Sequence, residues 1–398
     1  MVSLPGERML KVCIVLSLRR MWRGGISYYN NLLSSYRSCP DAGIRLLVAT
    51  DRPEDLADLR SESIEIRFCQ DLAVGGVLNW PRRKWRSVLR RQCGFDPKML
   101  RFMEKEQVDL ISHVSIGRQN SINTLFWQPD FQHRVLPHLF SSAERQHRDS
   151  EIAAVGEWGN ILLSSASAVN DFRQYYPELS GVRAHILHFP SLTAISVPPI
   201  AQSDLARDYP IQDPYLFLPN QFWCHKNHSI VVEALRDLPQ NIRVICTGLM
   251  EDRRNVSYVP ELLSKVKRYG LTDRFLCLGE VSYKTMISLM HYSMAVIQPS
   301  LFEGWSTTVE EAKALGKRIV LSDIAVHREQ APERGEYFDA HSAEALAVVL
   351  RSIYEEFDLS SERVTRKHFE KHREGLEGPF AKDFCRILRA VASQSGEE

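Results

Sequence analysis

The sequence lacks the features of several large protein classes. No apolar run approaches the ~18 residues needed to span a bilayer, and the first ten residues hold no long apolar core, so we expect neither a membrane span nor a signal peptide. The eight cysteines form no C-x-x-C pair, which predicts reduced thiols in a cytoplasmic protein. The formal net charge of +1 gives no reason to expect nucleic acid as a partner.

Two short motifs are absent as well. The chain contains no D-x-D and no His or Cys spacing typical of metal ligands, so we expect no obligatory metal ion. Gly24 and Gly25 follow the first expected strand but do not form the G-x-G-x-x-G fingerprint of a dinucleotide site. A glycine pair at a strand-to-helix turn permits close approach of a ligand, or is an ordinary flexible turn.

The chain is long enough for two domains, because 398 residues exceed what one hydrophobic core usually organises. Apolar runs alternate with helical patterns, which predicts an α/β fold with parallel sheets. The expected strands include 10–18, 44–49, 64–68, 108–112, 123–127, 161–165, 215–218, 241–248, 275–279 and 295–299. The segment from Phe189 to Pro214 contains five prolines and has weak periodicity, so we interpret it as the hinge. We expect domains at 1–200 and 201–370.

The stretch from Gln298 to Ser322 carries the strongest functional pattern. An apolar run ends at Pro299, a loop with Glu303 follows, and a helical pattern covers 309–315 before the next apolar run. Strand, loop, helix and strand place a helix N-terminus at the carboxyl edge of a parallel sheet, where its free amides suit a phosphate. A structural alternative is that Thr307 with Glu310, and Thr308 with Glu311, form capping boxes that need no ligand.

This stretch, FEGWSTTVEEA, resembles the E-x7-E signature of retaining glycosyltransferases of family 4, which have the GT-B fold. LPNQFWCHKNH (218–228) resembles the donor-diphosphate segment of the same family, and FWQPDFQHRVLPHLFS around His133 also fits. The resemblance implies two Rossmann-like domains that face each other across a cleft. It also implies that residues 371–398 form a terminal helix that crosses back to the first domain.

The resemblance implies roles for individual residues. Lys226 would neutralise the donor diphosphate, Glu303 would hold sugar hydroxyls or the developing positive charge, and His133 would face the transferred sugar. Glu311 would accept the hydroxyls of the nucleoside ribose. The remaining expected donor-binding residues are Gly25, Asn220, Gly304, Ser306, Thr307 and Thr308. Many relatives carry an Arg shortly before the Lys, whereas Asn220 and Gln221 stand near that place here.

The expected activity is therefore transfer of a hexose, with mannose the most plausible, from a GDP or UDP donor to a glycan or lipid-linked acceptor with retention of configuration. The alternatives are a transferase with a soluble acceptor, like sucrose or glycogen synthase, and a catalytically silent GT-B scaffold. The nucleotide sugar is a substrate, and no obligatory cofactor is expected.

The segment 79–92, NWPRRKWRSVLRRQ, contains six basic residues, no acidic residue and two tryptophans. Tryptophans and cations together suit a lipid headgroup interface, so we expect a peripheral contact with anionic lipid on the inner face of the plasma membrane. A solvated surface helix and a site for a polyanionic acceptor are the alternatives. The residues expected at this contact are Arg82, Arg83, Lys84, Trp85, Arg86, Arg90 and Arg91.

Overall fold

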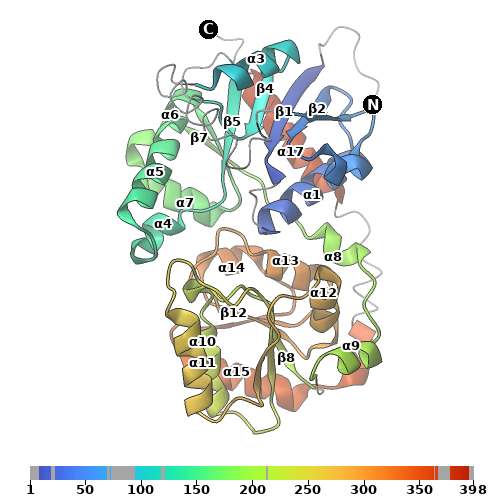
Figure 1. Ribbon diagram of the computed structural model, residues 1–398, viewed down its shortest axis with the longest axis vertical. Coiled ribbons are helices and arrows are strands. Elements are labelled where there is room, and N and C mark those ends of the chain that lie inside the picture. The colour runs from blue at the N-terminus through green and yellow to red at the C-terminus, as the bar shows by residue number, and fades with distance from the viewer. Residues whose placement is uncertain are drawn as a thin grey trace, which may run out of the picture. The chain divides into compact units, whose positions relative to one another are not determined.

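Figure 1 shows the computed structural model of the chain, which describes residues 9–18, 23–69, 72, 95–117, 122–211, 214–362, 364–365 and 377–393. The chain divides into two compact units. Unit 1 comprises Met1–Phe131, Ser142–Phe189 and Gly375–Glu398, and unit 2 comprises Gln132–Ser141 and Pro190–Glu374. The chain passes from unit 1 to unit 2 at Phe189 and Pro190, inside the proline-rich segment.

Unit 1 is built on a seven-stranded parallel sheet with the strand order β3-β2-β1-β4-β5-β6-β7. The inner strand β1 reads LKVCIVL and is largely buried, because helices cover both faces of a parallel sheet. The strands are β1 (Leu10–Leu16), β2 (Ile44–Thr50), β3 (Ile64–Phe68), β4 (Leu110–His113), β5 (Asn123–Gln128), β6 (Asn160–Leu163) and β7 (Arg183–Ile186). The helices are α1 (Arg23–Ser38), α3 (Pro97–Lys105), α5 (Ser142–Ala153), α6 (Val155–Trp158), α7 (Ala166–Tyr175) and α17 (Glu377–Ala392), with 3-10 turns η2 (Pro53–Leu59) and η5 (Pro177–Leu179).

Unit 2 repeats this design with six parallel strands in the order β10-β9-β8-β11-β12-β13. The strands are β8 (Leu216–Leu218), β9 (Val244–Cys246), β10 (Phe275–Cys277), β11 (Val296–Gln298), β12 (Ile319–Ser322) and β13 (Gly335–Phe338). The longer helices are α10 (His228–Arg236), α11 (Tyr258–Arg268), α12 (Tyr283–Tyr292), α13 (Thr307–Ala314) and α15 (Ala343–Glu356). The shorter ones are α4 (Gln132–Val135), η4 (Pro137–Leu139), α8 (Leu192–Ser196), α9 (Gln202–Asp208), η6 (Cys224–Lys226) and α14 (Ala325–Gln330). Two doubly wound parallel sheets confirm the predicted fold class.

The C-terminal helix α17 belongs to unit 1, where Figure 1 draws it in red among the blue elements of the N-terminal half. Arg389 Nη2 donates to Asp41 Oδ1 at 2.5 Å, next to the start of β2. The rings of Phe380 and Phe384 contact Tyr28 of α1 and His113 of β4, respectively. The last described helix therefore packs on the first one by apolar burial and one ion pair.

Some element boundaries differ from the sequence-based expectation. Helix α1 begins at Arg23, so Gly24 and Gly25 lie in its first turn rather than in a preceding loop. The N-cap of α7 is Ser165, because its side chain accepts from Ala168 N at 2.9 Å. The chain passes between the two units at the start of the expected hinge, and the rest of the hinge belongs to unit 2 and contains helices α8 and α9.

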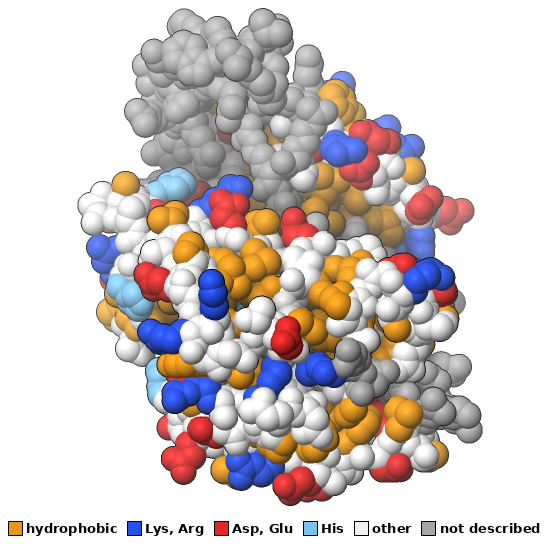
Figure 2. Space-filling model, turned by 60° about the horizontal axis from the view of Figure 1, so that its bottom comes forward, with side chains coloured by type: hydrophobic (Ala, Val, Ile, Leu, Met, Phe, Trp, Pro, Cys, Tyr) orange, Lys and Arg blue, Asp and Glu red, His pale blue; other side chains and the backbone are white. Residues whose placement is uncertain are grey.

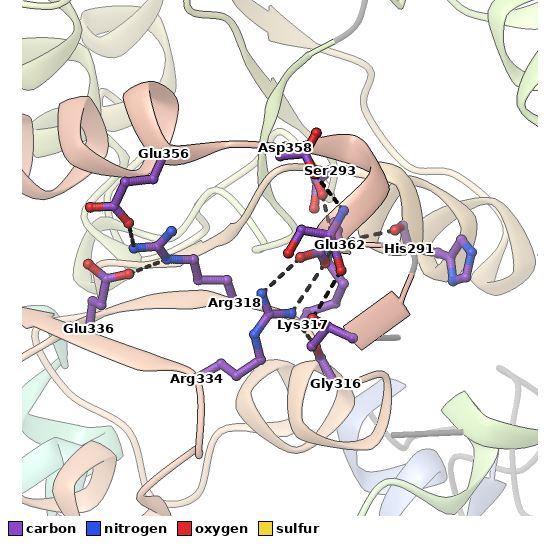
Figure 3. A network of polar contacts seen from close by, with 12 residues as sticks. His291, Ser293, Gly316, Lys317, Arg318, Arg334, Glu336, Glu356, Asp358 and Glu362 are labelled. Carbon is purple, nitrogen blue, oxygen red and sulfur yellow. Dashed lines mark hydrogen bonds and ion pairs between the residues drawn. The ribbon is translucent and has the colours of Figure 1, made fainter. Parts of the chain in front are cut away.

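A buried ion cluster holds the amino edge of the second sheet together (Figure 3). Lys317, which is fully buried, donates through Nζ to Ser293 O and to Glu362 Oε1, both at 2.7 Å. Arg334 donates to Glu362 Oε2 at 2.8 Å and to Gly316 O at 2.7 Å. Burial raises the pKa of Glu362, but the two cations lower it by more, so this carboxylate is ionised. The cluster connects the chain after α15 to the amino edge of the second sheet, which is opposite the carboxyl ends of its strands.

The surface has no obvious single sign of charge on the face seen in Figure 2, where acidic and basic side chains alternate with apolar ones. This mixture agrees with the net charge of +1. Within the described part of the chain, no helix is long and apolar enough to cross a bilayer.

Candidate functional site

The candidate site lies where two loops of unit 2 leave the middle of its sheet. Strands β8 and β11 are neighbours, and the strand order reverses between them. Lys226 follows β8, and Glu303 follows β11. In open parallel sheets, ligands bind beyond the carboxyl ends of the strands at such a reversal, because the two loops diverge there.

Lys226 and Glu303 form a partly buried ion pair at this point. Lys226 Nζ lies 2.5 Å from Glu303 Oε1, and the two side chains are 14% and 10% exposed. Burial raises the pKa of Glu303, but Lys226 and the hydrogen bonds around the carboxylate lower it by more, so the net pKa is below its ordinary value. The site therefore presents a fixed anion beside an ammonium, which carries three N–H groups and uses one of them in the bond to Glu303.

Gln298, the last residue of β11, connects this pair to the next element. Its side chain is fully buried, and Nε2 donates to Glu303 Oε1 at 2.8 Å and to Ser306 Oγ at 3.0 Å. Gln298 Oε1 accepts from Asn220 Nδ2 at 2.9 Å. One amide thus joins the loop after β8, the carboxylate and the start of α13.

Helix α13 begins at this junction. Ser306 is its N-cap, because Ser306 Oγ accepts from Val309 N at 3.4 Å. The alternative capping boxes at Thr307 and Thr308 are wrong, since both residues already lie within the helix. Gln330 of α14 fixes Ser306 further, donating to its carbonyl at 2.9 Å and accepting from its amide at 3.3 Å. A helix leaves the amides of its first turn without a partner inside the helix, so Thr307 and Thr308 offer donors to an anion.

Glu311 lies one turn into α13 and differs sharply from Glu303. It is 4% exposed, and burial raises its pKa to about 8, although a hydrogen bond with Tyr283 acts in the opposite direction. Tyr283, the first residue of α12, is also hydrogen-bonded to Ser191, just after the chain enters unit 2. At neutral pH, Glu311 is therefore largely protonated while Glu303 is ionised.

A third loop, after β9, leads towards His133. Asp252 Oδ2 accepts from Cys224 N at 2.7 Å, and Asp252 Oδ1 accepts from Arg254 N at 3.0 Å, which ties this loop to the turn that carries Lys226. The Arg254 guanidinium lies 4.1 Å from the ring centroid of Phe140. Phe140 and the buried His133 are in edge contact, with ring centroids 6.3 Å apart. His133 therefore belongs to a segment that is anchored beside the Lys226 turn.

The structure brings most of the expected residues together. Lys226, Glu303, Gly304 and the start of α13 are adjacent along two loops, and Asn220 is 4% exposed and engaged with Gln298. Gly25 lies in unit 1, in the first turn of α1. The seven residues of the expected membrane contact, 82–86, 90 and 91, lie outside the described residues.

Sequence reasoning missed Gln298, Gln330 and Tyr283. Gln298 is a polar residue at the end of an apolar strand, and that position could have indicated a role in the loop that follows. Gln330 and Tyr283 reach the site from α14 and α12, and their spacing from the E-x7-E motif carries no local signal. Among the described residues, no group of three or more His, Cys, Asp and Glu side chains is arranged to hold a metal ion.

One protein family matches the part of the chain that carries this site. Residues 206–368 match the family described as Glycosyl transferases group 1, a match that covers less than half of the chain and lies within unit 2. Among curated protein sequences, none matches the chain.

Solved structures share the fold over nearly the whole chain. HepE from Anabaena in complex with UDP and glucose has a TM-score of 0.67 and 16% identity, covering 96% of this chain and 100% of that chain. Sucrose-phosphate synthase from Thermosynechococcus elongatus has a TM-score of 0.66 and 15% identity, covering 97% and 100%. A glycosyltransferase from Rickettsia africae has a TM-score of 0.65 and 14% identity, covering 96% and 98%. The chain therefore has the two-domain GT-B fold.

Proposed function

We propose that this protein is a glycosyltransferase that moves a hexose from a nucleotide-diphosphate sugar to an acceptor hydroxyl. The observation that carries the proposal is the convergence of an ammonium, an ionised carboxylate and a helix N-terminus at the strand-order reversal of unit 2. The match of residues 206–368 to Glycosyl transferases group 1 and the GT-B fold support the same reaction class.

In the proposed reaction, the bond between the anomeric carbon and the diphosphate oxygen breaks, and the electron pair leaves with the diphosphate. The acceptor oxygen forms the new bond to the anomeric carbon, and its proton passes to the departing phosphate oxygen. Negative charge therefore grows on the diphosphate, where Lys226 and the amides of Thr307 and Thr308 can stabilise it. Loss of one such donor typically costs about 3–4 kcal/mol of barrier.

The other site residues take roles around this centre. Glu303 would face the sugar, holding hydroxyls or the positive charge that develops at the anomeric carbon, and Gly304 would let the donor approach the backbone. Glu311 would receive the ribose hydroxyls in place of Tyr283. His133 would contact the transferred sugar, Gly25 would face the donor from unit 1, and Asn220 would act through Gln298.

We propose the donor and the acceptor only from resemblance to other glycosyltransferases. The segment 218–228 favours mannose from a GDP or UDP donor, and the complex of HepE with UDP and glucose supports a UDP-hexose. A glycan or lipid-linked acceptor is the leading proposal. Sucrose-phosphate synthase among the similar structures supports a soluble acceptor as the second candidate.

We further propose retention of the anomeric configuration within family 4. No second carboxylate in the described part of the site is paired with Glu303 as a nucleophile, so a front-face substitution is the mechanism we favour. Product anomer analysis by NMR tests this directly, and an inverted product contradicts it.

The decisive test of the activity is donor hydrolysis and transfer, screened over UDP- and GDP-hexoses, with Lys226→Met and Glu303→Gln run in parallel. A donor turned over by the wild type and not by these variants supports an enzyme. If every donor is bound but none is turned over, the chain is a nucleotide-sugar-binding scaffold. The control is Ser288→Ala, a buried residue of α12 that bonds Lys284 O and Ile200 N away from the site.

We also propose that the protein works in the cytoplasm, with segment 79–92 in contact with anionic lipid. Liposome flotation with and without phosphatidylglycerol tests the contact. Replacing the six cations of this segment by Gln should abolish flotation with anionic vesicles, and unchanged flotation contradicts the idea.

A further inference from the structure

Gln298 lies between the residues to which roles are given above and has not itself been given a role in the transfer. It is a fully buried polar side chain at the end of β11, with hydrogen bonds to three separate segments. The two N–H groups of Nε2 are shared among three acceptors, Glu303 Oε1 at 2.8 Å, Ser306 Oγ at 3.0 Å and Ser300 Oγ at 3.2 Å. Burying an amide is unfavourable unless its polar atoms are satisfied, so this arrangement constrains all of its partners.

The ionised carboxylate of Glu303 determines which end of the Gln298 amide faces it, because a carboxylate only accepts hydrogen bonds. Asn220 Nδ2 donates to Gln298 Oε1 at 2.9 Å, and an NH2 group can donate only to an acceptor. The oxygen of Gln298 must therefore point towards Asn220, and its NH2 group must point towards Glu303. Asn220, in the loop after β8, thus satisfies the Gln298 oxygen that points away from Glu303.

We propose that Gln298 is the positioning residue for Glu303 in the transfer reaction, an inference that rests on the proposed function. It fixes the carboxylate against the N-cap of α13, so that the group facing the sugar and the group facing the phosphate keep one geometry. Gln298 acts through Glu303 and is not itself placed against the substrate.

The need for such a residue follows from the ion pair. Without substrate, Lys226 and Gln298 both reach Glu303 Oε1. When a diphosphate binds, the Lys226 ammonium is shared with a second, more highly charged anion. The hydrogen bond from Gln298 then still holds Glu303 in place, and the hydrogen bond with Ser300 still lowers the pKa of Glu303.

The test uses the full-length protein and two variants. Gln298→Leu removes the donor at nearly constant volume, and Gln298→Glu places a second carboxylate beside Glu303. With the best donor of the screen, we expect Gln298→Leu to lower kcat by about 10- to 100-fold with little change in KM, since misplacement of a reacting group is costly. Gln298→Glu should be less active still, because like charges disfavour ionisation of both groups.

Two readouts separate positioning from general support of the fold. Removing a donor to the charged form raises the pKa of Glu303, so the acid limb of kcat/KM should move up by about one pH unit or more. In a Glu303→Gln background, Gln298→Leu should have little further effect on kcat, because residues that act as a unit are not additive. Ser288→Ala, a fully buried side chain of the same unit, is the matched control and should leave the limb unchanged.

The pKa of Glu303 is also measured without turnover, by NMR of 13C-carboxyl-labelled glutamate in wild type and Gln298→Leu. If Gln298→Leu does not fold, Gln298→Asn, which retracts the amide by one methylene, replaces it in every comparison. An unchanged Glu303 pKa, or kcat losses that add fully in the double variant, overturns the inference. If the wild type turns over no donor, the proposed function fails, and the NMR titration still decides whether Gln298 controls Glu303.

Discussion

Replacing Glu303 by Gln removes one charge from the centre of the proposed site and changes little else in size. The wild-type carboxylate accepts from Lys226 Nζ at 2.5 Å and from Gln298 Nε2 at 2.8 Å, both at Oε1. A Gln in this place has one oxygen and one NH2 group, so it can satisfy these donors only when its oxygen faces them. It cannot balance positive charge at the anomeric carbon.

The expected loss follows from that charge. A preorganised group aimed at a charge that develops in the transition state is typically worth about 10²–10³ in kcat. We therefore expect Glu303→Gln to lower kcat by at least ~100-fold with the fold retained. The assay is release of nucleoside diphosphate, with the melting temperature and calorimetric binding of UDP or GDP as controls. Turnover near the wild-type rate in a folded variant that binds nucleotide refutes the role of Glu303.

Three further predictions concern other parts of unit 2. Glu362→Gln leaves the buried Lys317 with a weakened partner, so chemical denaturation should show that the free energy of unfolding falls by about 3–5 kcal/mol. The pKa of Glu362 is lowered in the folded state, so wild-type stability should also fall as the pH drops below ~4.3, where the unfolded carboxylate takes up protons. The pKa of Glu311 is about 8 in the folded state, above its unfolded value, so ionisation of this group at higher pH opposes folding. The stability of the wild type relative to Glu311→Gln should therefore be highest below pH ~4.3 and decline as pH rises towards 8, which chemical denaturation at a series of pH values measures. If the ribose hydroxyls require ionised Glu311, binding of a nucleoside diphosphate should release a proton near pH 7. The binding heat measured by calorimetry should then vary with the ionisation enthalpy of the buffer in the wild type and not in Glu311→Gln.

The sequence predicted the parts of the site that follow directly from strand ends. Lys226 and Glu303 stand in loops after apolar runs, and parallel strands bring their carboxyl ends to one edge, so their meeting could be expected. The direct ion pair between Lys226 and Glu303 could not be predicted. The distance between Lys226 Nζ and Glu303 Oε1 depends on the left-handed conformation of Asn227 (φ 57°) after η6 and on the course of the loop after β11. The fold class was equally accessible, since strands and helices alternate throughout both halves.

Errors occurred where several residues could serve one local purpose. Ser306, Thr307 and Thr308 all carry hydroxyls that can cap a helix, and only the backbone decides which one does. The prolines between Phe189 and Pro214 suggested a linker, but prolines also precede short helices, as Pro199 precedes α9. Gln298 and Tyr283 were missed for a different reason: a buried amide and a helix N-terminal tyrosine acquire their roles only from tertiary neighbours.

The opposite pKa shifts of the two glutamates bear on how the site meets a diphosphate. Glu303 is ionised because an ammonium and several donors surround it, whereas Glu311 is buried against Tyr283 and is largely neutral at pH 7. Lys226, Glu303 and Glu311 together therefore carry no net charge. Under the proposed function, attraction of a diphosphate would depend on the direction of the N–H groups of Lys226 and of the first turn of α13, because oriented donors act at short range even where net charge is balanced. Gln298 bonds both Glu303 and Ser306, so one amide links the carboxylate proposed to face the sugar to the helix end proposed to face the phosphate.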